Sequence, residues 1–192
     1  MVCWKVTVDL VTDAELLAAH VAGDRHAFGD LVKRHYDQLW RTAVRTSYSR
    51  EDAADALQEA LLKAHRSAGD FRAAASVSTW LHRIVVNACL DRIRRNKARP
   101  AVTLDYTETP EPSDPRNVTA ERETAALIER ALAVLPPDQR AAIVAVDVEG
   151  YSVNEAADLL GVPSGTVKSR CARGRLRLAQ ELEFLRDPRN RT

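Results

Sequence analysis

The sequence predicts an all-α fold. Long stretches rich in Ala, Leu and Val show the apolar spacing of amphipathic helices, and only 7 glycines and 8 prolines interrupt the 192 residues. Aromatic residues make up 5% of the chain, so small aliphatic side chains must build most of the core. Hydrophobic residues at 45% suffice for a folded core, and the length allows one domain or two small ones.

The first half of the chain is predicted to hold four helices. Helical periodicity begins near Thr12 and continues with few breaks to about Asn96. Gly23, a Ser-Tyr-Ser turn at 47–49 and the stretch 69–76 divide it. The expected helices are Thr12–Ala22, Arg25–Thr46, Arg50–Ala68 and Ser78–Arg95.

Composition changes at residues 97–119, which hold four prolines and four acidic residues. Such a stretch has too little apolar surface to fold alone. We therefore expect two small helical domains, at 12–96 and 120–186, joined by a flexible acidic linker. The helices expected after the linker are Thr119–Leu135, Pro137–Glu149, Ser152–Leu160 and Ser164–Leu185.

The last two helices have the signals of a helix-turn-helix. Ser152 and Glu155 have the spacing of a capping box at the start of the first helix. Gly161 suits the left-handed conformation that ends a helix, and Ser164 is an expected N-cap of the second. A short helix, a turn of about three residues with Gly and a second helix describe this DNA-binding motif.

The second helix of the motif has a thin apolar face. A helical wheel places Val167, Cys171, Gly174 and Leu178 on one side, which we expect to pack inward. Residues 161–178 carry five basic side chains and no acidic one. A solvated surface helix would also explain this charge. The capped motif directly upstream favours insertion into the major groove of DNA, where a small, polar and basic face is required.

Several classes of protein are excluded or disfavoured. The net charge of +1 identifies no partner, since an average hides local asymmetry. Three cysteines lie far apart without a CxxC pair, which is typical of a reducing compartment. Charges interrupt the N-terminal apolar residues, so we expect no signal peptide, and no run approaches the roughly 18–20 residues that span a bilayer. We expect a soluble, cytoplasmic protein without membrane insertion.

An enzyme is not expected either. The five histidines lack metal-ligand spacing, and the sequence contains neither HExxH nor a glycine-rich phosphate loop. We therefore expect no catalytic residues, no metal and no cofactor.

The N-terminal domain adds two charged features. Asp52, Asp55 and Glu59 form an acidic stripe at helical spacing, with Gln58 alongside. Further on, basic residues cluster at the end of the last helix of this domain, which follows Phe71 and carries Trp80. Aromatic side chains beside a basic groove are the arrangement that holds single-stranded bases by stacking.

The order of these motifs resembles the extracytoplasmic-function (ECF) sigma factors, which are compact bacterial transcription initiation factors. The resemblance covers roughly residues 13–183 and rests on three stretches in order: DAADALQEALLKA, FRAAASVSTWLHRIVVNACLDRIRR and LPPDQRAAIVAVDVEGYSVNEAADLLGVPSGTVKSR. It implies sigma region 2 at 12–96, a linker, and sigma region 4 at 120–186. It also implies that the chain binds core RNA polymerase and directs promoter-specific initiation.

The resemblance implies roles for named residues. Those expected to contact the polymerase clamp are Asp52, Asp55, Gln58 and Glu59. Those expected to hold the single-stranded minus-10 element are Phe71, Trp80, Asn87, Arg92, Arg94 and Arg95. Those expected to contact the minus-35 duplex are Ser164, Thr166, Lys168, Ser169, Arg170, Ala172, Arg173 and Arg175. Among them, Arg173 is the candidate for bidentate recognition of guanine.

Partners and rivals follow from the same resemblance. The expected partners are bacterial core RNA polymerase, promoter DNA and an anti-sigma factor, which in this family is often membrane-anchored. The main rival is a helix-turn-helix repressor that acts without polymerase and uses residues 12–96 for dimerisation or ligand binding. A pure adaptor protein would leave the basic face of the second helix without a function.

Overall fold

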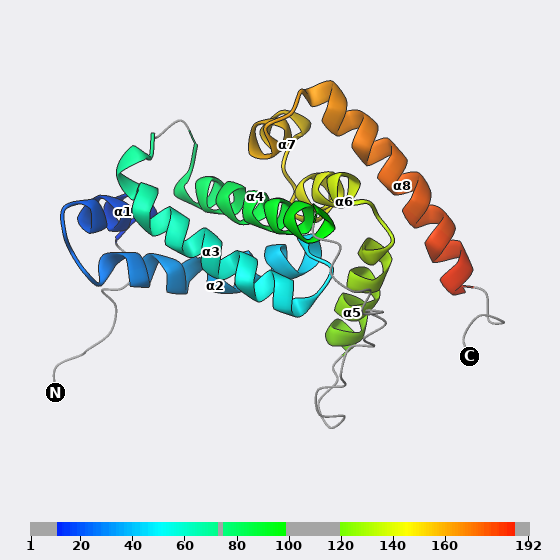
Figure 1. The fold of residues 1–192 in the computed structure, drawn as a ribbon, viewed down its shortest axis with the longest axis horizontal. Coiled ribbons are helices and arrows are strands. Elements are labelled where there is room, and N and C mark those ends of the chain that lie inside the picture. Colours follow the sequence, from blue (N-terminus) through cyan, green and yellow to red (C-terminus); the bar gives the residue numbers. More distant parts are fainter. Residues whose placement is uncertain (1–10, 73–74, 99–119, 187–192) are drawn as a thin grey trace, which may run out of the picture.

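The computed structural model describes residues 11–72, 75–98 and 120–186, and it confirms an all-α fold across them (Figure 1). The predicted linker lies outside the described residues except for Lys97 and Ala98, which belong to the preceding helix. Within the described ranges, no helix combines the length and the apolar character that a membrane crossing demands.

The N-terminal domain contains four α-helices. They are α1 (Asp13–Val21), α2 (Ala27–Thr46), α3 (Arg50–Ser67) and α4 (Val77–Ala98). A short 3₁₀ turn, η1 (Ala68–Asp70), follows α3 and extends into the stretch 69–76 that was expected to be a break. The three long helices lie side by side, and α1 lies across one end of them (Figure 1).

Local signals explain where two of these helices begin. Glu15 N donates to the Thr12 hydroxyl at 3.2 Å, and Thr12 N donates to the Glu15 carboxylate at 2.7 Å, which completes a capping box. Asp52 N donates to the Ser49 hydroxyl at 3.1 Å at the start of α3. Each such N-cap is worth about 1 kcal/mol of helix stability.

The core of this domain consists of small and aliphatic side chains, as the composition predicted. Alanines of α3 are buried against α2 and α4, where their small size lets the helices approach closely. Leucines complete the core, and each contributes about 1.5–3 kcal/mol relative to an exposed side chain. The core leucines of the long helices are Leu31, Leu39, Leu57 and Leu81.

The C-terminal domain also contains four α-helices. They are α5 (Ala120–Ala133), α6 (Pro137–Ile143), α7 (Val153–Leu160) and α8 (Ser164–Arg186). The prediction of one α-helix over Pro137–Glu149 is wrong beyond Ile143. From Val144 to Val148 the chain forms a π-helical turn, η3, closed by Glu149 N donating to Val144 O at 2.9 Å. In this wider turn the first two residues stay buried while Glu149 reaches α2.

The two domains pack against each other through α4 and α2. Val86 and Leu90 of α4 are 4% and 6% exposed, and they belong to the same apolar cluster as Leu135 and Leu159 of the C-terminal domain. His82 of α4 lies with its ring 6.1 Å from that of Tyr151. The helix that was expected to hold the minus-10 strand is therefore shared between both cores.

Acid should weaken this junction through His82. The ring is 1% exposed, Nδ1 is 2.9 Å from Ser78 O, and Nε2 has no partner among the described residues. Burial lowers the pKa of His82 below its ordinary value of 6.5. The unfolded state therefore binds the proton first, and the stability that neutral His82 provides is complete above pH 6.5 and lost as the pH falls below it.

We expect urea unfolding at a series of pH values to show this loss, and His82→Phe to remove the part of it that His82 causes. A variant with the same pH dependence as the wild type would contradict the assignment. The other histidines stay unchanged in both proteins, so the difference between the two curves isolates His82.

Candidate nucleic-acid interface

The predicted helix-turn-helix is confirmed in its local geometry. Glu155 N donates to the Ser152 hydroxyl at 3.2 Å, and Ser152 N donates to the Glu155 carboxylate at 2.8 Å. Gly161 adopts φ 64° at the end of α7, a left-handed conformation that disfavours other residues. Pro163 O then accepts the first bond of α8 from Thr166 N at 2.8 Å. The turn between the two helices is therefore fixed by its own sequence.

The inward face of α8 is also confirmed. Val167 and Cys171 are 0% and 2% exposed, and the Cys171 thiol lies 3.6 Å from Ala142 O. Gly174 lies where α8 passes closest to α6. A Cβ atom added at Gly174 would lie 2.8 Å from Cγ1 of Ile143 and 3.2 Å from its Cδ1.

The close approach at Gly174 gives a prediction for stability. Gly174→Val should lower the free energy of unfolding by about 1–3 kcal/mol, because the buried side chain of Ile143 must move. Gly165→Ala is the matched control in the same helix, since a Cβ there meets nothing within 4 Å. Urea unfolding followed by circular dichroism measures both. Equal stability of the two variants would show that the contact with Ile143 does not restrict the size of the side chain at position 174.

The outward face of α8 carries the predicted minus-35 residues, and acidic side chains hold two of them. Arg170 pairs with Asp138 of α6 at 2.8 Å, and Arg175 pairs with Asp147 of η3 at 2.8 Å. These ion pairs fix the long side chains against the domain. They also reduce the positive charge that Arg170 and Arg175 present outward.

The remaining predicted residues of α8 project with less restraint. Arg173 is exposed and donates from Nε to Ser169 O at 3.2 Å on its own helix. Lys168 is exposed and makes no ion pair with any residue that the structure describes. Ser164 and Thr166 are half-buried in the first turn, and Ala172 is exposed. Leu176 follows with 63% of its surface exposed, so the polar face ends near Arg173.

Two arginines of α4 bind the acidic stripe of α3. Arg92 of α4 donates from Nε to Asp52 at 2.7 Å, bonds Asp55 through Nη2, and lies 3.4 Å from Glu59 through Nη1. Arg95 adds a contact to Glu59 at 2.6 Å. The bond to Asp52 is the largest cause of the raised pKa of the Arg92 guanidinium. Three residues expected to contact polymerase thus share one ionic cluster with two expected to contact DNA.

The other residues expected in region 2 are distributed over several surfaces. Gln58 lies beside the acidic stripe in an apolar groove of about 600 Å³ between α2 and α3. Arg94 pairs with Asp91 of its own helix at 2.9 Å. Asn87 is half-buried and follows Trp80 by two helical turns on the same face of α4.

Phe71 has a packing role. Its half-buried ring lies against Trp80, with ring centroids 5.4 Å apart and an angle of 61° between the planes. Edge-on aromatic contacts of this kind add about 0.5–1.5 kcal/mol to the burial of the rings. The contact fixes the loop before α4 against the N-terminal core.

Sequence reasoning did not single out two charged side chains that lie at the junction between the domains, those of Arg140 and Glu149. Arg140 is 1% exposed at the junction between the domains, and Glu149 bonds to α2. For Arg140, the sequence contained a signal of burial. It directly precedes the apolar run Ala141, Ala142 and Ile143, at a position that helical spacing places in the core.

Comparisons with known proteins agree on both halves of the chain. A family model described as Sigma-70 region 2 matches residues 31–99, and one described as Sigma-70, region 4 matches residues 125–178. The chain is 60% identical over 174 residues to the ECF RNA polymerase sigma factor SigM of Mycobacterium tuberculosis, covering 91% of this chain and 86% of the relative. It is 32% identical to the ECF RNA polymerase sigma-E factor of Escherichia coli K12, covering 86% and 91%.

Solved structures give the same fold. The chain superposes on CnrH, solved in complex with the cytosolic domain of CnrY, with a TM-score of 0.64 and 27% identity, covering 89% of this chain and 97% of that one. The sigma factor RpoE of Bartonella quintana, solved with the anti-sigma factor NepR, gives a TM-score of 0.66 at 24% identity, covering 82% and 98%.

Proposed function

The chain belongs to the extracytoplasmic-function sigma factors of bacterial RNA polymerase, and we propose that its two domains divide promoter recognition between them. It directs core RNA polymerase to initiate transcription. Sigma-factor relatives that match 91% of the chain exclude the repressor alternative. In our proposal the C-terminal domain reads the minus-35 duplex and the N-terminal domain holds the opened minus-10 strand.

The observation that carries the minus-35 assignment is the outward face of α8. Lys168 and Arg173 project from a capped helix-turn-helix whose inward face is buried at Val167, Cys171 and Gly174. A basic helix held this way fits the major groove, where arginine pairs with the N7 and O6 atoms of guanine. Arg170 and Arg175, restrained by Asp138 and Asp147, would contact phosphates at the edges of the groove.

The minus-10 assignment rests on α4. Trp80 and Asn87 share one face of this helix, so an aromatic surface and an amide are available to one extended strand. Stacking stabilises an unpaired base, and an amide reads a base edge. Opening the duplex then requires binding energy for flipped bases and no hydrolysis, which supports a factor without enzymatic activity.

Polymerase binding is assigned to the exposed side of α3. Asp55, Gln58 and Glu59 are at the surface beside the apolar groove, and Asp52 lies deeper in the ionic cluster. A negative surface would orient the chain on a basic element of the polymerase clamp. An anti-sigma factor is a further proposed partner, since a sigma factor of this fold, RpoE of Bartonella quintana, is solved with the anti-sigma factor NepR. All these partners place the proposed activity in the cytoplasm.

Runoff transcription with core bacterial polymerase over a pooled genomic promoter library tests the proposal. We expect transcripts with defined starts that need both the polymerase and this protein, and that decline in Asn87→Ala. Transcripts that do not change when this protein is added would contradict it. Such a lack of stimulation, together with polymerase-independent binding to a palindromic duplex, would instead favour the repressor.

A further inference from the structure

The junction between the domains contains a carboxylate that belongs to one domain and is bound by the other. The side chain of Glu149, in the C-terminal domain, is 9% exposed. It accepts from the Thr42 hydroxyl at 3.1 Å and from the Gln38 amide at 3.4 Å, and it lies 3.5 Å from a guanidinium nitrogen of Arg45. All three partners lie on α2, in the N-terminal domain.

A second contact at the junction runs through Arg140. Its Nη1 donates to Ser47 O at 2.5 Å, and its guanidinium lies 3.8 Å from the centroid of the Tyr48 ring. The Tyr48 hydroxyl in turn donates to Leu135 O at 3.0 Å. Every partner of this cation is neutral, since no carboxylate pairs with Arg140 in the described part of the chain.

The contacts at the junction act in opposite directions on closure. Nε and Nη2 of Arg140 are buried without a partner among the described residues, and burial lowers the pKa of Arg140 to about 10. A buried, incompletely bonded cation costs free energy that opening would return. The apolar contacts of Val86 and Leu90 and the bonds to Glu149 oppose this cost. Two packings close in free energy are what a conformational device requires.

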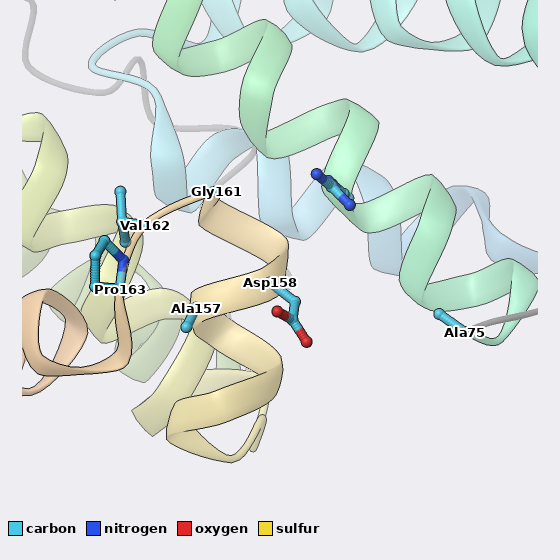
Figure 2. Close-up of a pocket in the computed structure, with 7 residues that line it drawn as sticks. Ala75, Ala157, Asp158, Gly161, Val162 and Pro163 are labelled. Atoms are coloured by element: carbon cyan, nitrogen blue, oxygen red, sulfur yellow. The ribbon is translucent and has the colours of Figure 1, made fainter.

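Closure also brings the start of α8, proposed to bind the minus-35 duplex, beside α4, proposed to hold the minus-10 strand. A cleft of about 520 Å³ between α4 and the turn of the helix-turn-helix is lined by Arg83, Asp158 and Pro163. Figure 2 shows Asp158 and Pro163 among its lining residues. The major groove alone is about 12 Å wide, so a duplex cannot enter this space. α8 begins directly after Pro163 and therefore starts beside α4 in the closed chain.

Binding to both promoter elements at once requires the two domains to lie far apart. Elements at minus-35 and minus-10 are about 25 base pairs apart, which is roughly 85 Å of duplex at 3.4 Å per pair. A closed chain of this length has a radius of gyration of only about 16 Å. The closed chain therefore cannot contact both elements at once.

We propose that Glu149, held by Gln38, Thr42 and Arg45 of α2, forms a latch that keeps the free chain closed against the cost of buried Arg140, and that polymerase binds the open form. The latch limits the fraction of free protein that is competent to bind. This inference rests on the proposed function for its consequence in transcription, while the closed state itself can be measured on the chain alone.

Charge reversal at Glu149 tests the latch. In Glu149→Lys, the new ammonium faces Arg45, and we expect the radius of gyration of the free full-length chain to rise by several ångströms in small-angle X-ray scattering. The double variant Glu149→Lys with Arg45→Glu restores an opposite pair and should return the radius toward the wild-type value. Asp30→Lys is the matched control, because among the described residues Asp30 pairs only within α2, with Lys33 at 3.1 Å, and its charge changes equally.

Transcription supplies the second readout. The apparent affinity of polymerase scales with the competent fraction, so we expect Glu149→Lys to reach half-maximal runoff transcription at a roughly three- to tenfold lower protein concentration. The double variant should reverse this gain. Unchanged scattering in Glu149→Lys would overturn the latch, and expansion without a gain in transcription would overturn its inhibitory role. Absence of polymerase-dependent transcripts from every variant would contradict the proposed function instead, and scattering would still decide the latch.

Discussion

Arg173→Ala is expected to reduce transcription from this protein's own promoters by roughly 10- to 100-fold, because a bidentate contact to guanine is worth about 1–3 kcal/mol. The side chain is exposed at the end of the polar face of α8, and its Nε is held by Ser169 O. It contributes nothing to the buried core, so the free energy of unfolding should not change. Runoff transcription on a defined promoter measures the loss, and urea unfolding checks the fold.

Lys168→Ala separates base reading from phosphate binding in the same helix. A lysine on phosphate should lose affinity almost equally on all sequences and lower the salt dependence of binding by about one charge. Arg173→Ala should instead lose the preference for the specific promoter. If Arg173→Ala weakened binding to unrelated duplexes as much as to the promoter, the assignment of Arg173 to a base would be wrong.

The helix-turn-helix could be predicted almost completely because its signals are local. Ser152 with Glu155, Gly161 and the inward positions Val167 and Cys171 each depend on residues a few positions apart. Chain geometry alone then decides the turn and the buried face. The π-helical turn η3 escaped prediction because the apolar spacing of α6 continues into it.

Contacts between distant segments could not be predicted in this way. The acidic stripe of α3 has the sequence pattern of a solvated face, and nothing near it in the chain indicates that Arg92 reaches it from α4. The same is true of Glu149, whose partners on α2 lie more than a hundred residues earlier. Pairing across helices depends on their tertiary arrangement, which local periodicity does not specify.

The ionic cluster gives the last prediction, a loss of stability in Arg92→Ala. Without this guanidinium, Asp52, Asp55 and Glu59 face one another with fewer cationic partners. The Arg92 side chain is 24% exposed, so water screens part of the effect, and we expect a loss of about 1–3 kcal/mol rather than the 3–5 kcal/mol of a fully buried pair. Urea unfolding at low salt measures it.

Arg94→Ala is the matched control for Arg92→Ala, since Arg94 lies two residues further along α4, is 66% exposed and pairs only with Asp91. Such a surface pair is worth about 0–1 kcal/mol. Raising the salt concentration should narrow the difference between wild type and Arg92→Ala, because released carboxylates repel one another less when screened. Equal losses in the two variants would mean that the cluster does not hold α3 to α4. Arg92 would then be available to DNA, as its place in the sequence suggested.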